Sequence, residues 1–218
     1  MIKSFDELTI KKYRDLINLE RIDDTEYGIE ILSILSDMEP DELLDMPLEK
    51  FASLMAQTKF IYGNVEKADY KKLGKVITVN GKDYRLMKSA RDLTAGQYID
   101  YKAYIQRDDF LGMLPYILTV FLIPEGHKYN NGYDVSELAK EFDENMSLPI
   151  ALSVSDFFLH QSLMSIRSSV TYLKWKMKRM MKKEKNQEMK GQIKNCLAQL
   201  ESLQGLLSHS DGFIPQSK

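Results

Sequence analysis

The longest apolar stretch of the chain reads FLGMLPYILTVFLIP and runs from Phe110 to Pro124. A helix needs roughly 20 apolar residues to cross a bilayer, and this stretch has only about 15 and contains Pro115. We therefore expect no membrane span here, but a buried helix that opens at Asp108 or Asp109. Its buried residues should include Leu111, Leu114, Leu118 and Phe121.

The composition around this stretch is that of a globular protein. The chain has 218 residues, of which 44% are hydrophobic and 28% are charged, which suits one large domain or two small ones. Cys196 is the only cysteine. This count excludes an internal disulfide and a thiolate metal cluster, and it fits a reducing compartment.

The small net charge of -2 hides a strong segregation of charge. Residues 1–70 contain 16 acidic and 8 basic residues, a net of -8. Residues 167–190 contain 9 basic and 2 acidic residues, a net of +7. This polarity indicates that the two ends face different surroundings, or each other.

The first 70 residues predict a small helical unit with an acidic outside. Ser4 and Glu7 form a capping-box pattern, which predicts a helix to about Leu19. A second helix should end at Pro40, and a third should begin around Pro47.

Residues 75–87 predict a two-stranded β-hairpin. The β-rich run KVITV, residues 75–79, is followed by Asn80-Gly81 and then by KDYRLM, residues 82–87. Asn-Gly between two such runs is the strongest short hairpin signal, because both central residues of a type I′ turn need a positive φ.

Helical patterns return after the hairpin. Thr94 and Gln97 form a second capping box, and Asp134 should start a short amphipathic helix that ends near Phe142. The dipeptide Leu148-Pro149 predicts a break in the chain.

The C-terminal part predicts long helices. One should run from about Leu152 to Met189, and Gly191 should separate it from the helix that follows. Beyond it, leucines and an isoleucine recur at three- and four-residue steps, which is typical of a narrow helical seam. These residues are Ile193, Leu197, Leu200, Leu203 and Leu207.

Together these patterns predict a mainly α protein with minor β structure. We expect a helical, bundle-like fold with one β-hairpin near residues 75–87 and long C-terminal helices. The expected segments are an acidic unit at 1–70, a hairpin with helices at 71–150, and a third segment at 151–218. The third segment holds the basic helix, the leucine seam and a tail.

No set of residues in the sequence has the spacing of a catalytic, cofactor or metal site. His127, His160 and His209 lie far apart, whereas a zinc site needs four ligands. The chain has no phosphate-binding glycine loop and no nucleophile elbow. Cys196 lies on an apolar stripe and should be a small buried side chain. We therefore expect a protein that is not an enzyme and uses no cofactor.

The basic segment Lys174–Lys185 is the sharpest feature of the sequence, and it has three interpretations. It could neutralise phosphates of a nucleic acid, with Trp175 stacking on bases. It could be the solvated face of a helix whose Trp175, Met177, Met180 and Met181 pack inward, or it could dock on an acidic partner such as residues 1–70 of another copy. Protein docking or a solvated face ranks above nucleic-acid binding, because the run is short. The contact residues would be Lys174, Lys176, Lys178, Arg179, Lys182 and Lys183.

Several short strings resemble small virion-module proteins of tailed bacteriophages that infect gut Bacteroidetes, including crAss-like phages. These strings are LTAGQYID at 93–100, LPYILTVFLIPEG at 114–126, KYN at 128–130, GYD at 132–134, LSV at 152–154 and FFL at 157–159. The likeness covers about residues 75–175 and carries no catalytic signature.

The resemblance implies a non-enzymatic virion protein, made in the host cytoplasm. It would be a cargo protein held in the portal–tail barrel or a component of a ring. Its partners would be portal, ring or tail proteins and copies of itself, with weak contact to DNA. The alternatives are a tail assembly chaperone that leaves before the particle matures, and a nucleic-acid-binding protein that uses residues 174–185.

Overall fold

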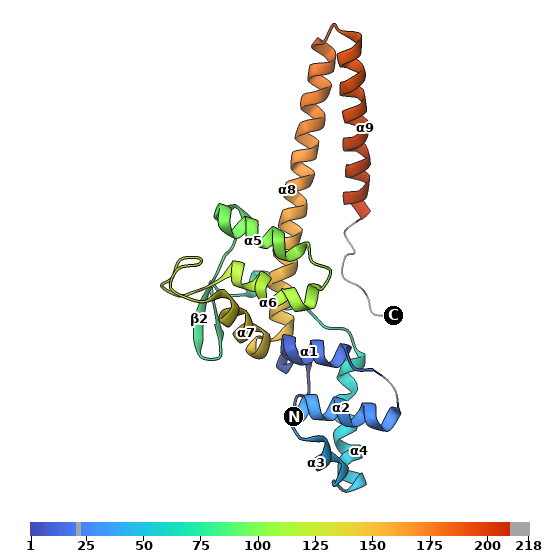
Figure 1. Cartoon of the computed structure of the whole chain (residues 1–218), viewed down its shortest axis with the longest axis vertical. Coiled ribbons are helices and arrows are strands. Elements are labelled where there is room, and N and C mark those ends of the chain that lie inside the picture. Colours follow the sequence, from blue (N-terminus) through green and yellow to red (C-terminus); the bar gives the residue numbers. More distant parts are fainter. Residues whose placement is uncertain (21–22, 210–218) are drawn as a thin grey trace. The chain divides into compact units, whose positions relative to one another are not determined.

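The computed structural model describes residues 1–20 and 23–209, apart from the side chains of Arg91, Leu203 and residues 206–209. The chain divides into two compact units, residues 1–157 and residues 158–218. The described part is mainly helical with one small antiparallel sheet, which confirms the predicted fold class (Figure 1).

The first unit contains short helices and all the described strands. Its α-helices are α1 (Ile10–Ile17), α2 (Asp24–Ser36), α3 (Pro40–Leu44), α4 (Leu48–Gln57), α5 (Ala95–Ile105), α6 (Phe110–Phe121) and α7 (Val135–Asn145). Its strands are β1 (Val76–Val79), β2 (Lys82–Leu86) and β3 (Leu122–Pro124). Four short 3₁₀ turns lie at Phe5–Glu7, Thr58–Tyr62, Tyr70–Lys72 and Ala90–Asp92.

The predicted helix start at Ser4 is wrong. Ser4 makes no side-chain cap, and only a 3₁₀ turn follows it. The helix α1 begins at Ile10, where the Thr9 hydroxyl oxygen accepts from the Lys12 N–H at 3.4 Å. Between them Leu8 is fully buried and extended, and its carbonyl accepts from the Leu148 N–H at 2.8 Å. Tertiary pairing at Leu8 therefore overrides the local capping pattern.

The second helix also ends earlier than predicted. It ends at Ser36, because the next residue, Asp37, takes the left-handed conformation (φ 57°), and Pro40 begins α3 instead. Proline is tolerated at the first helical position because its missing N–H would have no intrahelical partner there. The third helix begins directly after Pro47, as predicted.

The N-terminal helices pack through two clusters of buried side chains. One joins α1, α2 and the start of α8, and the other joins α2 and α3 with half-buried residues of α4. The first consists of Leu8, Leu16, Ile31, Leu35 and Leu148, and the second of Ile29, Leu32 and Leu43.

The predicted hairpin is confirmed, and a third strand extends it. Asn80 and Gly81 have positive φ of 50° and 73°, as a type I′ turn requires. The strand β3 pairs antiparallel with β2, Arg85 facing Ile123. The last three residues of the apolar stretch therefore form a strand and not the end of a helix.

The buried helix α6 ends against groups from two other elements. Its last carbonyls would lack intrahelical partners. The Gln97 side-chain amide donates to the Val120 carbonyl at 2.7 Å, and the Met87 N–H donates to the Phe121 carbonyl at 3.0 Å. The Tyr101 and Phe121 rings pack edge to face at 5.2 Å. The capping box of Thr94 and Gln97 is confirmed, and it holds Gln97 in place.

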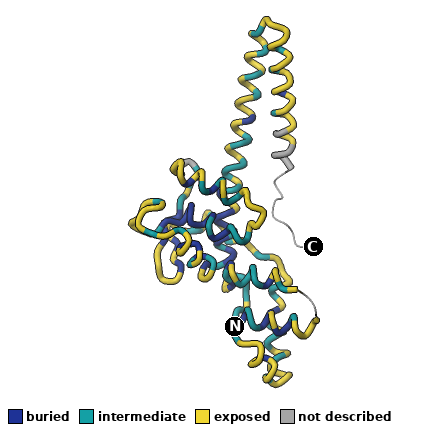
Figure 2. Tube along the Cα trace, viewed as in Figure 1, coloured by how far each residue is buried: buried dark blue, intermediate teal, exposed yellow. Residues whose placement is uncertain are grey.

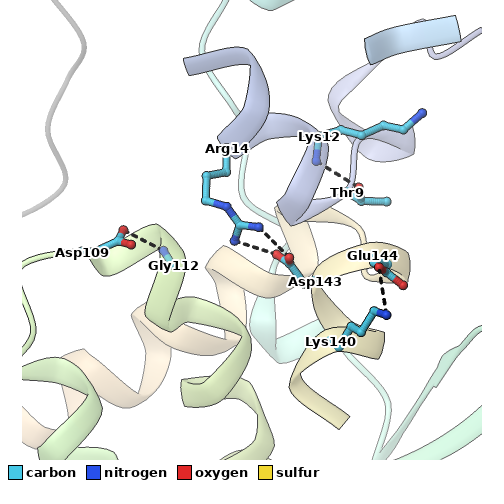
Figure 3. Close-up of polar contacts among 8 residues, drawn as sticks. All are labelled: Thr9, Lys12, Arg14, Asp109, Gly112, Lys140, Asp143 and Glu144. Carbon is cyan, nitrogen blue, oxygen red and sulfur yellow. Dashed lines mark hydrogen bonds and ion pairs between the residues drawn. The ribbon is translucent and has the colours of Figure 1, made fainter. Parts of the chain in front are cut away.

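The helix α7 is joined to α1 by a two-pronged ion pair (Figure 3). The Arg14 guanidinium donates to both carboxylate oxygens of Asp143, at 2.9 and 2.6 Å. This hydrogen bond, with the nearby Asp143 charge, raises the pKa of Arg14. Such bidentate pairs fix geometry more firmly than single contacts.

The helix α8 (Leu148–Lys183) runs from the first unit into the second. Leu148-Pro149 does not break the chain, because Pro149 lies in the first helical turn, where an N–H is not needed. The helix α9 (Gln187–His209) follows after a short turn. There the Asn186 side chain accepts from the Glu188 N–H at 2.9 Å. The predicted interruption at Gly191 is therefore wrong, and Gly191 lies inside α9.

The two helices of the second unit lie side by side and antiparallel (Figure 1). Val170 and Leu197 are buried, and Ile193 and Leu200 of the predicted seam are half-buried. The side chains of Leu203 and Leu207 lie outside the described residues. No helix in the described part of the chain has both the length and the apolarity to cross a membrane.

We expect Gln97→Leu to lower the free energy of unfolding of the first unit by about 1–3 kcal/mol, because it leaves buried polar groups without partners. Chemical denaturation followed by circular dichroism measures this. The control Gln106→Ala removes an exposed amide at the end of the same helix and should change stability by less than about 0.5 kcal/mol. Equal effects of the two substitutions would contradict the assigned role.

Candidate docking surface

One face of α8 carries exposed aromatic and basic side chains together. They recur at steps of three and four residues, so they share one side of the helix. Together they line a shallow, open depression. We call this set the cationic–aromatic stripe, and it consists of Tyr172, Trp175, Lys176, Arg179, Met180 and Lys183.

The large side chains of the stripe are exposed to solvent. Trp175 is 55% exposed, Tyr172 57% and Met180 43%. Exposed positions dominate the α8–α9 hairpin as a whole (Figure 2). Isolated exposed apolar residues are ordinary, whereas several on one face mark an interaction surface.

The stripe is organised by contacts among its own members. The rings of Tyr172 and Trp175 have centroids 6.1 Å apart and are tilted by 31°. The Arg179 guanidinium carbon lies 5.6 Å from the centre of the Trp175 ring, a cation–π contact. Partial ordering of these side chains lowers the entropy cost of binding a partner.

The opposite side of α8 faces α9. Lys174 Nζ donates to Gln204 Oε1 at 2.7 Å and lies 3.7 Å from Glu201 Oε1. Met177 and Met181 are half-buried on the same side of α8. The interpretation in which Trp175 and Met180 pack inward as well is wrong for these two residues, because both are exposed.

The six basic residues predicted as contacts therefore divide into three groups. Lys174 joins the two helices. Lys176, Arg179 and Lys183 belong to the stripe. Lys178 and Lys182 are exposed on its flank. Within the described residues, the lysines of the last two groups form no ion pair.

The sequence interpretation missed Tyr172 and the outward direction of Met180. The signal was present, because positions 172, 175–176, 179–180 and 183 follow the helical repeat. The basic run by itself predicts only the positive charge of this helix. The aromatic and thioether side chains lie between the cations on the same face.

Other reactive groups do not gather around the stripe. Within the described residues no three His, Cys, Asp or Glu side chains lie close enough to hold a metal ion. Cys196 is exposed, which corrects its predicted burial. His160 is exposed as well.

The largest pKa shifts belong to tyrosines of the first unit. Burial raises the pKa of Tyr70 to about 12, and its hydroxyl donates to the Met87 carbonyl at 2.6 Å. Burial and a 2.7 Å hydrogen bond to Asp100 raise the pKa of Tyr129 well above its usual value. Both phenols stay protonated at neutral pH and act as structural donors.

A comparison of the chain with protein-family models, with curated proteins and with solved structures finds no significant match.

Trp175 is the only tryptophan of the chain, so its fluorescence reports on the stripe alone. We expect iodide to quench it strongly, because neighbouring cations raise the local anion concentration. Reversal of Lys176 and Arg179 to Glu should weaken quenching by iodide and leave quenching by neutral acrylamide unchanged. The control reverses Lys190 and Lys194 on α9. Equal iodide quenching of both variants would contradict the proposed electrostatics.

Proposed function

We propose that this chain is a non-enzymatic protein of a tailed bacteriophage particle, and that it acts by binding other virion proteins. It would be a cargo protein held in the portal–tail barrel or a component of a ring. The observation that carries the proposal is the cationic–aromatic stripe on a helix that has solvent on that face.

The composition of the stripe supports binding to a macromolecule. Tryptophan, tyrosine, methionine and arginine are enriched in the centres of protein interfaces, whereas lysine is depleted there and enriched at solvated surfaces. Trp175 and Arg179 supply the first type of contact, and Lys176 and Lys183 stand beside them. A purely solvated helix face does not need the two exposed aromatic rings.

The phage setting rests on the resemblance of residues 75–175 to virion-module proteins of crAss-like phages. That range includes the sheet, α5, α6, α7 and α8 as far as Trp175. The protein would be made in the host cytoplasm and end in the virion. Portal, ring and tail proteins would be its partners.

Peptide mass spectrometry of gradient-purified particles from infected cells tests this location. We expect the chain to be present at a fixed ratio to the portal protein, because a virion component is assembled in set numbers. Portal peptides in the same sample serve as the positive control.

Absence of the chain from mature particles would contradict a virion role. If it then co-purified from infected cells with a fibrous tail protein, the alternative function as a tail assembly chaperone would hold instead.

Nucleic-acid binding is a second candidate, favoured by the position of Arg179 over Trp175. Proteins that bind single strands combine cations that follow the backbone with aromatic rings on which bases stack. The stripe offers three cations and two rings, which is a small version of such a surface.

This candidate predicts affinity for single-stranded DNA that falls steeply with salt. Three phosphate contacts give a slope of about -2 in a plot of log K against log salt. Fluorescence anisotropy with a labelled oligonucleotide measures it. The triple variant K176E/R179E/K183E should not bind, while the equally charged control K185E/K190E/K194E should retain binding. Unchanged binding by the first variant would exclude the stripe.

A further inference from the structure

The turn between α3 and α4 presents carboxylates around two exposed leucines. Leu44 is 64% exposed and Leu48 81%. Asp41, Asp45 and Glu49 lie beside them and are exposed as well. We call these five residues the acidic knob.

The charge of this turn is not compensated nearby. Between Asp37 and Glu49 the sequence contains six acidic residues and no basic one. Asp37 is paired with Lys12 at 2.7 Å. Among the described residues, none of the three carboxylates of the acidic knob forms an ion pair.

The leucines of the acidic knob are not explained by the core of the first unit. Leu43, their neighbour, is buried in the cluster with Ile29 and Leu32. Leu44 and Leu48 point away from that cluster, so burial of their exposed surface by a partner would be favourable. An apolar pair surrounded by charge of one sign is suited to a partner with apolar groups and the opposite charge.

The cationic–aromatic stripe has that chemistry. It offers Lys176, Arg179 and Lys183 against three carboxylates, and Trp175 and Met180 against two leucines. We propose that the stripe of one copy docks on the acidic knob of a second copy. The inference deepens the proposed function and rests on it for its biological setting, since it names the partner of the same stripe.

The two different surfaces allow two kinds of assembly. Two copies that dock stripe on knob reciprocally form a closed two-fold dimer. A copy that gives its stripe to one neighbour and its acidic knob to another makes heterologous contacts, which close into rings or grow into open filaments. The same chemistry predicts that association is faster at low salt, because complementary charges steer the encounter.

Sedimentation velocity of the purified full chain over a range of concentrations tests the contact. We expect wild-type protein to associate in a concentration-dependent way. The stripe variant K176E/R179E/K183E and the knob variant D41K/D45K/E49K should each weaken association by roughly tenfold or more, which corresponds to about 1.4 kcal/mol.

A mixture of the two variants gives the sharpest result. Each variant alone carries like charges on both surfaces and should repel itself. In the mixture every stripe meets a knob of opposite charge, so association should return. All the changed side chains are exposed, and unchanged helical circular dichroism confirms that each variant folds.

Two matched controls reverse equal numbers of charges elsewhere, namely K185E/K190E/K194E and E20K/E30K/E66K. Both should associate like the wild type. The proposal would be overturned by a wild-type chain that stays monomeric, by association that survives either surface variant, or by a mixture that stays monomeric. Binding of an oligonucleotide to a monomeric chain through the stripe would overturn it in favour of nucleic acid.

These outcomes are independent of the virion test. A pure protein that stays monomeric while mass spectrometry finds the chain in particles would refute self-docking and keep the proposed function. A self-docking protein that is absent from particles would refute the virion role and keep the contact.

Discussion

Burial of most of residues 114–123 is the constraint on which the first unit depends. The helix α6 has seven buried residues, so neighbouring elements must cover it on most sides. Its last backbone carbonyls also need hydrogen-bond donors from outside the helix. Gln97 of α5 and Met87, the residue after β2, supply these donors. The chain then continues directly into β3, which ties the helix to the hairpin. One apolar segment thus determines where α5 and the sheet must lie.

The second unit has no comparable apolar segment, and this explains its exposed surface. Two antiparallel helices can bury only the sides that face each other, here around Val170 and Leu197. Lys174 adds a polar link to α9. The remaining faces stay in contact with solvent or with partners. Charged and aromatic side chains on such an exposed face therefore change the stability of the hairpin little. That face of α8 can then serve as a contact surface.

Local signals in the sequence were sufficient to predict the structure wherever a few neighbouring residues determine the conformation. The Asn80-Gly81 turn and the Thr94 capping box belong to this class. Features that depend on distant partners were not predictable. The strand β3 exists because β2 lies beside it, and the helix start moved from Ser4 because Leu8 pairs with Leu148 at the start of α8. For the docking surface, the sequence located the basic run, but only the packing of α8 on α9 separates Lys174 from the outward cations.

Self-docking requires that the stripe and the acidic knob cover each other between copies. Hydroxyl-radical labelling of the wild-type chain, read residue by residue by mass spectrometry at low and high protein concentration, measures this cover. We expect Trp175, Met180, Leu44 and Leu48 to lose labelling together as concentration rises, while Tyr62, exposed elsewhere in the first unit, keeps its labelling. Unchanged labelling of Trp175 and Leu48 in an associated sample would contradict it.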